Sequence, residues 1–211
     1  MTHTLLKSVS IAALIASSVP MTAAAKEAGD LLMRARVIYV APDESATTSI
    51  GGTVGLNNDV VPELDFTYFL TDNIGVELIL ATTKHSATAI NTALGASVEL
   101  GNAMLLPPTL TLQYHFNPKG SISPYVGAGI NYTFFYSENA AGGAITDINL
   151  KDSFGLALQA GLDFKVNDKW SFNVDVKKIW LNTDVSINGG GVTAQLDINP
   201  WVMGVGFGYT F

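Results

Sequence analysis

Charged side chains of both signs recur in segments of this sequence that are otherwise apolar. The residues of this kind are Arg34, Arg36, Asp65, Glu77, Asp163, Lys165, Asp175 and Lys177. Several of them are two positions apart, which would place both members on one face of a β-strand. Such a set could form buried ion pairs, an ion pathway or a proton relay. Which of these it forms depends on the elements that position it.

The segments that carry these residues alternate between large apolar residues and residues of other kinds. In the last stretch of the chain the large side chains are Trp201, Met203, Val205, Phe207, Tyr209 and Phe211. The positions between them include Gly204, Gly206 and Gly208. A soluble sheet would place polar residues opposite its core, whereas glycine fits the crowded interior of a narrow barrel. The pattern therefore favours a closed barrel whose bulky side chains face lipid.

Eight segments show this alternation. They are residues 31–40, 60–70, 74–81, 108–116, 122–135, 152–166, 169–181 and 199–211. The links between them are long at 41–59, 82–104, 136–151 and 182–196, and short at 71–73, 117–121 and 167–168. An even number of strands of roughly 9–11 residues, with short periplasmic turns, is typical of outer-membrane barrels. We predict an all-β fold, an eight-stranded antiparallel transmembrane up-and-down β-barrel with both termini in the periplasm.

The start of the chain and its composition agree with export. Residues 1–25 contain Lys7, a short apolar segment and three small residues at 23–25, the pattern of a cleaved signal peptide. A membrane anchor helix would need roughly 20 apolar residues, more than this run provides. The barrel is then predicted at residues 26–211, with a net charge near −8, because the chain's −7 loses only Lys7. The chain has no cysteine, which excludes disulfides. A soluble β-sandwich or lipocalin-like barrel would need polar outward faces, which these strands lack.

Several sequence blocks are similar, in the same order, to those of a known family. They are TDNIGVEL (71–78), LPPTLTLQYHF (106–116), PYVGAGINYTFF (124–135), LKDSFGLALQAGLDF (150–164) and DINPWVMGVGFGYTF (197–211). These blocks resemble the OmpW family of eight-stranded outer-membrane β-barrel proteins, and the likeness is weakest in the long links. The resemblance implies a narrow hydrophobic lumen and a proposed part in moving small hydrophobic molecules across the outer membrane. Some members of that family also serve as bacteriocin receptors.

The direction of each strand places the eight charged residues toward the periplasmic half of the barrel. Charges in a confined, partly dry space persist only when they are paired, so we expect ion pairs that plug the lumen. An ion pathway or a proton relay is the alternative. Above them the inward positions are apolar: Ile38, Val40, Ile79, Ala81, Pro107, Ala157, Ile179, Leu181 and Val202. They predict a blind cavity for a slender hydrophobic ligand, or else a packed barrel core.

Four prolines are predicted at the outer ends of strands, where each removes a donor from the hydrogen-bond ladder. They are Pro62, Pro107, Pro108 and Pro200. Such lateral gaps could release a ligand sideways into the membrane. They could equally do no more than end strands at the rim.

Other functions are less well supported by the sequence. His115 is expected on the periplasmic side, and His85 is expected in a solvated loop beside hydroxyl residues such as Ser86. Because no catalytic set, metal-ligand spacing or cofactor motif is apparent, we predict no enzymatic activity, no metal site and no cofactor. The remaining alternative is a passive structural, adhesive or receptor barrel without a transported ligand. Paired glycines in the long links favour mobile loops over a rigid adhesive sheet.

The predicted partners follow from this location. They are outer-membrane lipid and lipopolysaccharide, a small hydrophobic ligand, and the barrel assembly machinery through the C-terminal strand that ends in Phe211. The acidic balance of the chain argues against binding to nucleic acid, because it would repel phosphates.

Overall fold

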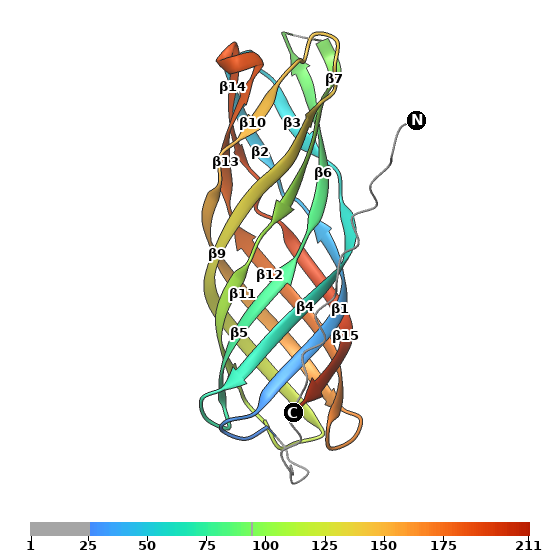
Figure 1. The fold of residues 1–211 in the computed structure, drawn as a ribbon, viewed down its shortest axis with the longest axis vertical. Coiled ribbons are helices and arrows are strands. Elements are labelled where there is room, and N and C mark those ends of the chain that lie inside the picture. Colours follow the sequence, from blue (N-terminus) through green and yellow to red (C-terminus); the bar gives the residue numbers. More distant parts are fainter. Residues whose placement is uncertain (1–25, 94) are drawn as a thin grey trace, which may run out of the picture.

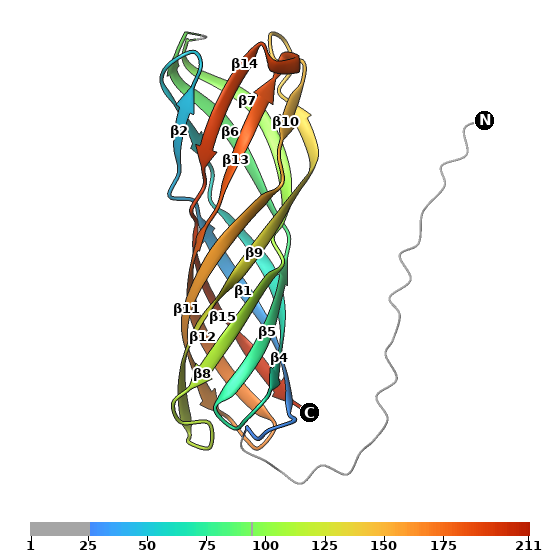
Figure 2. The same cartoon turned by 90° about the vertical axis from the view of Figure 1, so that its left-hand side faces the viewer.

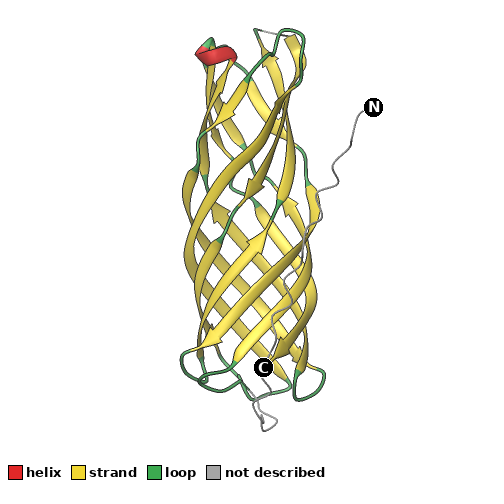
Figure 3. Ribbon diagram, viewed as in Figure 1, coloured by secondary structure: helices red, strands yellow, loops and turns green. Residues whose placement is uncertain are grey.

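The structure, a computed structural model, describes residues 26–93 and 95–211 (Figure 3). The predicted signal peptide, residues 1–25, lies outside the described residues. The strands are β1 (Leu31–Ala41), β2 (Ser45–Thr48), β3 (Thr53–Leu56), β4 (Asp59–Phe69), β5 (Ile74–Ala81), β6 (Thr83–Thr92), β7 (Gly95–Leu106), β8 (Thr109–His115), β9 (Ile122–Ala140), β10 (Ile148–Leu150), β11 (Ser153–Lys165), β12 (Trp170–Trp180), β13 (Asn182–Ile187), β14 (Val192–Asp197) and β15 (Trp201–Thr210). A single-turn 3-10 helix, η1, spans Asn188–Gly190. Within the described ranges no helix is long and apolar enough to cross a membrane.

Eight of these strands close into an antiparallel barrel. Around the barrel they follow the order β1, β4, β5, β8, β9, β11, β12 and β15, and β15 pairs with β1 to close the ring. Neighbours around the ring are also consecutive among these eight strands, so the topology is up-and-down. Figures 1 and 2 show the tilted strands of a tall cylinder, with the C-terminus at the end that carries the short turns. The predicted eight-stranded barrel is confirmed.

The four long links continue the wall of the cylinder instead of forming loops. β6 pairs with β3 and β7, and β7 pairs with the upper part of β9. A second sheet, in the order β10, β13, β14 and β2, completes this upper part. β9 is the longest of the described strands and runs through both levels (Figure 1). The assignment of these links as loops is therefore wrong, because strand pairing continues beyond the part of the wall that alternates most clearly in the sequence.

The paired glycines of the long links lie at turns between these strands. Gly52, Gly143 and Gly189 have φ values of 72°, 63° and 64°. This left-handed conformation favours glycine, which has no Cβ. The turns of an ordered β-structure explain these residues, so the glycines no longer argue for mobile loops.

The alternation predicted from the sequence is present along the barrel wall. In β11 the outward side chains of Phe154 and Leu156 are 61 % and 58 % exposed, whereas that of Ala157 is 1 % exposed. The outer surface is apolar from strand to strand, with Leu112 and Phe207 also more than half exposed. A wall of this composition is suited to contact with hydrocarbon.

The glycines of β15 lie opposite the arginines of β1. A Cβ atom on Gly206 would collide with the backbone of β1 and with the side chain of Arg36. A Cβ atom on Gly208 would crowd the side chains of Leu32 and Arg34. The glycine face of the last strand therefore makes room for two long side chains that cross the lumen.

Candidate functional site

Nine charged side chains meet inside the barrel, and we refer to them as the ion-pair layer. They are Lys26, Arg34, Arg36, Glu63, Asp65, Glu77, Asp163, Asp175 and Lys177. None of them is more than 8 % exposed. β1, β4, β5, β11 and β12 position eight of the nine, because alternate residues of each strand face the lumen. Seven of the eight charged residues selected from the sequence lie in this layer.

Arg34 connects three other strands of the barrel. Its guanidinium nitrogens lie 2.9 Å from an oxygen of Asp163, 3.1 Å from one of Asp65 and 3.4 Å from one of Glu77. The guanidinium also lies over the ring of Tyr125, 5.1 Å from the ring centroid. A planar group with five donors suits such a shared position. Arg34 therefore ties β1 to β4, β5 and β11.

Arg36 and Lys177 form the second part of the layer. Arg36 nitrogens lie 2.8 Å from a Glu63 oxygen and 2.7 Å from an Asp65 oxygen. The Lys177 ammonium group donates to Glu63 at 3.0 Å and to Asp175 at 2.7 Å. Buried charges are costly unless they are paired and hydrogen-bonded. Each of the nine side chains has at least one oppositely charged partner within 4.0 Å, so the layer fills this part of the lumen with ion pairs.

Two members of the layer, Lys26 and Glu63, were not predicted. Lys26 precedes β1, and its ammonium group donates to Asp163 at 2.5 Å and to Ser123 at 3.1 Å. No strand pattern in the sequence marks a residue that enters the barrel from its end. Glu63 could have been found, since it stands two residues before Asp65 and therefore shares its face of β4.

The prediction that Lys165 belongs to the charged plug is corrected by the structure. Lys165 is the last residue of β11, its side chain is 38 % exposed, and it pairs at 2.9 Å with Asp168 in the following turn. It therefore lies at the rim of the barrel and not in the layer. A similar exposed pair joins Lys119 to Asp72 at 2.8 Å, and this hydrogen bond lowers the pKa of the Asp72 carboxyl group. Exposed pairs of this kind contribute little to stability.

The lower cavity is an apolar space directly above the ion-pair layer. Eight of the nine predicted apolar residues line it: Ile38, Val40, Ile79, Ala81, Pro107, Ile179, Leu181 and Val202. Ala157 is buried in the same apolar cluster but does not line the cavity. Glu63 and Lys177 also line the cavity, so the ion-pair layer forms its floor.

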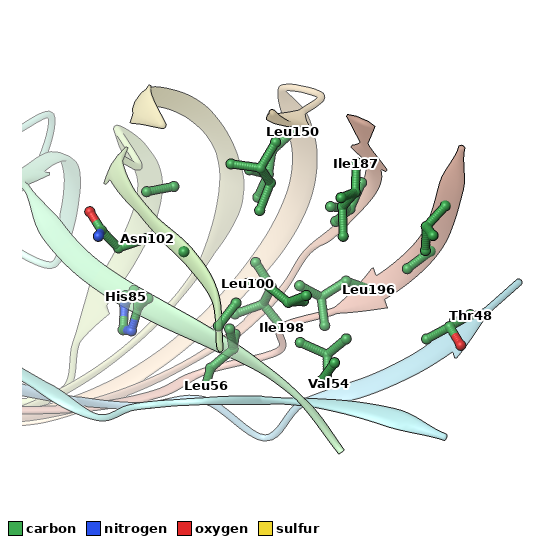
Figure 4. A pocket seen from close by; sticks show the side chains of 18 of the residues that line it. Thr48, Val54, Leu56, His85, Leu100, Asn102, Leu150, Ile187, Leu196 and Ile198 are labelled. Carbon is green, nitrogen blue, oxygen red and sulfur yellow. The ribbon is translucent and has the colours of Figure 1, made fainter. Parts of the chain in front are cut away.

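The upper cavity is a second apolar space, enclosed by the strands of the long links. Figure 4 shows side chains such as Val54, Leu100, Ile187 and Leu196 converging on it. Most of its lining side chains are apolar, and the polar ones include His85 and Asn102. The sequence did not predict this cavity because its walls were assigned to loops.

His85 is buried between the two cavities. It belongs to β6, is 5 % exposed and lines both of them. Leu105 and Ile198 are also common to both linings, so these three residues mark the boundary. The expectation of a solvated loop histidine is wrong, because the segment around His85 is a strand whose alternate residues face inward.

A polar hollow lies on the other side of the ion-pair layer, at the end with the short turns. It is lined by Lys26 and Asp163 of the layer and by Trp170, among others. It shares no lining residue with the lower cavity, whose floor is formed by Lys177 and Glu63. The ion-pair layer therefore separates the two spaces.

The two cavities are lined mainly by apolar side chains. The Nδ1 atom of His85 lies 2.8 Å from the carbonyl oxygen of Asn57, which is not a group that a base could activate. Among the described residues there is no cluster of three or more histidines and carboxylates that could hold a metal ion. Stacked apolar spaces above a paired, polar floor offer a place where a molecule can bury its apolar surface.

The chain is similar to known proteins along most of its length. The sequence model of the OmpW family matches residues 27–211. The protein belongs to the OmpW family. The outer-membrane protein y4mB of Sinorhizobium fredii is 41 % identical over 184 residues, which cover 85 % of this chain and 79 % of that relative. The resemblance seen in the sequence is confirmed.

A solved structure and a more distant relative extend this OmpW-family comparison. The crystal structure of the outer membrane protein OprG from Pseudomonas aeruginosa superposes with a TM-score of 0.83 at 33 % identity, covering 88 % of this chain and 97 % of OprG. The "Dibenzothiophene metabolism operon protein PahQ" of Pseudomonas aeruginosa is 28 % identical over 166 residues, which cover 76 % of each chain.

As a member of the OmpW family, the protein is a β-barrel of the bacterial outer membrane. The apolar outer face of its wall therefore contacts lipid. Short turns of such barrels face the periplasm and long links face the outside. The two apolar cavities thus lie toward the outside of the cell, and the polar hollow lies on the periplasmic side.

Three of the four selected prolines interrupt backbone pairing near the lower cavity. Pro62 lies within β4, not at its end, and the pairing of β4 with β5 stops one residue later at Glu63. Pro107 and Pro108 separate β7 from β8, and the pairing of β5 with β8 stops at Thr109. Proline has no N–H group, so these residues cannot extend either ladder.

Pro200 differs from the other three. It is buried, and its carbonyl oxygen accepts a hydrogen bond from the backbone of Ile179 at 3.1 Å. Close by, the backbone N–H group of Asp43 donates a hydrogen bond to the carbonyl oxygen of Ile198 at 3.0 Å. Backbone hydrogen bonds thus bridge the wall at this point, which argues against the gap expected at Pro200.

Proposed function

We propose that this OmpW-family barrel admits small hydrophobic molecules from outside the cell and helps them across the outer membrane. The observation that carries the proposal is the stacking of two apolar cavities, with shared lining residues, above the ion-pair layer. Burial of apolar surface away from water is favourable by a free energy of about 25 cal/mol per Å². Binding in the cavities is therefore favourable for apolar molecules in general, because the hydrophobic effect does not depend on a particular ligand shape.

In this proposal the ion-pair layer is a plug. Its charges are held by oppositely charged partners on different strands, and Arg34, Asp65 and Glu77 are fully buried. An ion pathway needs sites that ions can enter and leave, whereas these groups already form ion pairs with one another. The geometry therefore favours a closed floor over an ion pathway or a proton relay.

A closed floor requires an exit through the wall, which we place beside the upper end of β5. Its pairing with β8 ends at Ile79, and Ala81 and Pro107 face the lower cavity just beyond that point. Because Pro107 and Pro108 cannot donate to β5, the wall has fewer backbone hydrogen bonds there. The side-chain bond from the Thr82 hydroxyl to the carbonyl oxygen of Leu105, at 3.2 Å, bridges the wall at this level. A hydrophobic molecule that left at this level would enter the hydrocarbon of the membrane directly.

The likeness to other proteins supports the class of ligand. The name of the PahQ relative refers to dibenzothiophene, an apolar aromatic molecule, and the cavities of the present barrel are lined mainly by apolar side chains. The other proposed partners are lipid and lipopolysaccharide around the wall, and the barrel assembly machinery at the last strand, which ends in Phe211. We propose no enzymatic role, because the binding and release of a hydrophobic ligand involve no change in covalent bonds.

Uptake of the apolar dye N-phenyl-1-naphthylamine tests the proposal. Cells that contain the barrel should accumulate the dye severalfold faster than cells without it. Replacement of Val202, which lines the lower cavity, by tryptophan should remove most of this gain because the larger side chain fills the cavity. The matched control is Val205→Trp in the same strand, which points to lipid and should leave uptake unchanged.

Two outcomes would contradict the proposal. If cells with and without the barrel take up the dye at the same rate, the passive structural or receptor interpretation is favoured. If Val202→Trp and Val205→Trp behave alike, uptake does not pass through the lower cavity. Folding of each variant is checked by the change in gel mobility between heated and unheated samples.

A further inference from the structure

The boundary between the two cavities is polar on one side only. His85, Leu105 and Ile198 line both cavities, and His85 contributes the polar group among the three. Figure 4 shows the His85 ring among side chains that consist mostly of carbon. A molecule that moves from the upper to the lower cavity must therefore pass this imidazole.

The hydrogen bond of His85 determines which of its nitrogens faces the ligand. Nδ1 lies 2.8 Å from the carbonyl oxygen of Asn57, and a carbonyl can only accept, so Nδ1 carries the hydrogen and donates it. In a neutral imidazole Nε2 is then the acceptor. His85 is thus held in one tautomer, with the acceptor nitrogen at the opposite edge of the ring from Asn57.

The polar groups of the cavity floor are less available to a ligand. Lys177 donates to both Glu63 and Asp175, and the hydroxyl group of Thr109 donates to the carbonyl oxygen of Pro107 at 3.0 Å. No protein partner of His85 Nε2 is among the hydrogen bonds of the described residues. An acceptor in an apolar passage favours a ligand that brings a donor, because an unmet acceptor is costly once water is excluded.

We propose that His85 is a specificity-determining residue that favours hydrophobic molecules carrying one hydroxyl group, such as long-chain alcohols or phenols, over plain hydrocarbons. The apolar part of such a molecule lies in the cavities, and its hydroxyl group donates to Nε2 of His85. The inference rests on the proposed uptake function and adds a substrate class to it.

Competing uptake of 1-decanol and decane tests the inference. His85→Asn places an amide nitrogen near the position of Nδ1, so it keeps the bond to Asn57 but lacks the group that faces the cavities. We expect it to lower the ratio of decanol to decane uptake by about threefold to tenfold, the effect of one hydrogen bond. His85→Gln reaches further, restores an acceptor near the position of Nε2 and should retain the ratio. Leu105→Met is the control at the same boundary.

The outcomes separate this inference from the function on which it rests. An unchanged ratio in His85→Asn, or an equal loss for decanol and decane, overturns the role of His85 while uptake itself stands. If the wild-type barrel accelerates neither compound, the proposed function fails and the inference fails with it. A fall in the ratio for Leu105→Met as large as that for His85→Asn would assign selectivity to the width of the passage and overturn the inference.

A second measurement, by nuclear magnetic resonance, uses the wild-type protein and so does not depend on the folding of a variant. Residues 26–211 contain two histidines, His85 and His115, so the ring nitrogens of the ¹⁵N-labelled protein in lipid nanodiscs are readily distinguished. Added 1-decanol should shift the Nε2 resonance of His85, and added decane should not shift it comparably. An Nε2 resonance that responds equally to both compounds, or to neither, would overturn the proposal.

Discussion

Replacement of Arg34 by methionine is expected to lower the free energy of unfolding by about 3–5 kcal/mol, the usual effect of removing one partner from a buried ion pair. Methionine approximates the length of the arginine stem but has no charge. The change leaves Asp65, Glu77 and Asp163 with fewer cations, and the Thr67 hydroxyl loses its bond from the guanidinium. Urea unfolding of the barrel in lipid vesicles measures the effect.

The matched control for Arg34→Met is Lys165→Met. Lys165 is also a cation of the barrel, but it is 38 % exposed and pairs with Asp168 at the rim. Its replacement should change the free energy of unfolding by less than about 0.5 kcal/mol. Equal stabilities of Arg34→Met and the wild-type protein would show that the layer does not hold the strands together as described.

Simultaneous replacement of Glu77 and Asp163 by alanine is expected to open the barrel to ions. Asp163 holds Lys26 and Arg34, while Glu77 contacts Arg34 and Arg36 and accepts a hydrogen bond from Thr111. Without these carboxylates the cations lose partners, side-chain volume is removed and water can enter the lumen. In planar bilayers the wild-type protein should show very small or no conductance, and the double variant should conduct at least severalfold more.

The control for the conductance experiment is the pair Asp43→Ala and Asp168→Ala. It changes the net charge by the same amount, but both carboxylates are exposed and lie outside the ion-pair layer. Its conductance should match that of the wild-type protein. A large, stable wild-type conductance would refute the plug, and an increase as large in the control would assign the effect to net charge.

The barrel could be predicted because a membrane wall imposes a simple rule on its residues. Outward positions must be apolar, and in a narrow lumen inward positions are charged, small or glycine, so the two faces of a strand such as β11 are readable from the sequence. The same rule placed Arg34 and Arg36 inside. The glycines of β15 agreed with it, because Gly206 and Gly208 lie against the side chains of these arginines.

The parts that were not predicted lie where this rule no longer applies. Beyond the lipid both faces of a strand can be polar, so the strands of the long links show weaker alternation, and the upper cavity and the burial of His85 were missed. Lys26 enters the lumen from outside any strand. Lys165 stands two residues after Asp163, so the alternation along β11 assigns it to the inner face. Because it is the last residue of the strand, its long side chain can extend into solvent instead of into the ion-pair layer.

In the proposed function, a ligand leaves sideways through the wall because the ion-pair layer closes the floor of the lower cavity. The chain has no cysteine, so engineered pairs can be crosslinked without interference. Continuing the ladders past Ile79–Thr109 and Glu63–Ala81 would bring Leu80 opposite Pro108, and Pro62 opposite Thr82. Cysteine pairs at these positions would lock the two sides of β5. The control is a cysteine pair at Val37 and Val205, which are partners in the fully paired wall between β1 and β15.

Uptake of N-phenyl-1-naphthylamine before and after crosslinking therefore tests the account most directly. Crosslinks on the two sides of β5 should abolish most of the uptake, and reduction of the disulfides should restore it, while the control pair should have no effect. Undiminished uptake with both sides of β5 locked would contradict the lateral exit.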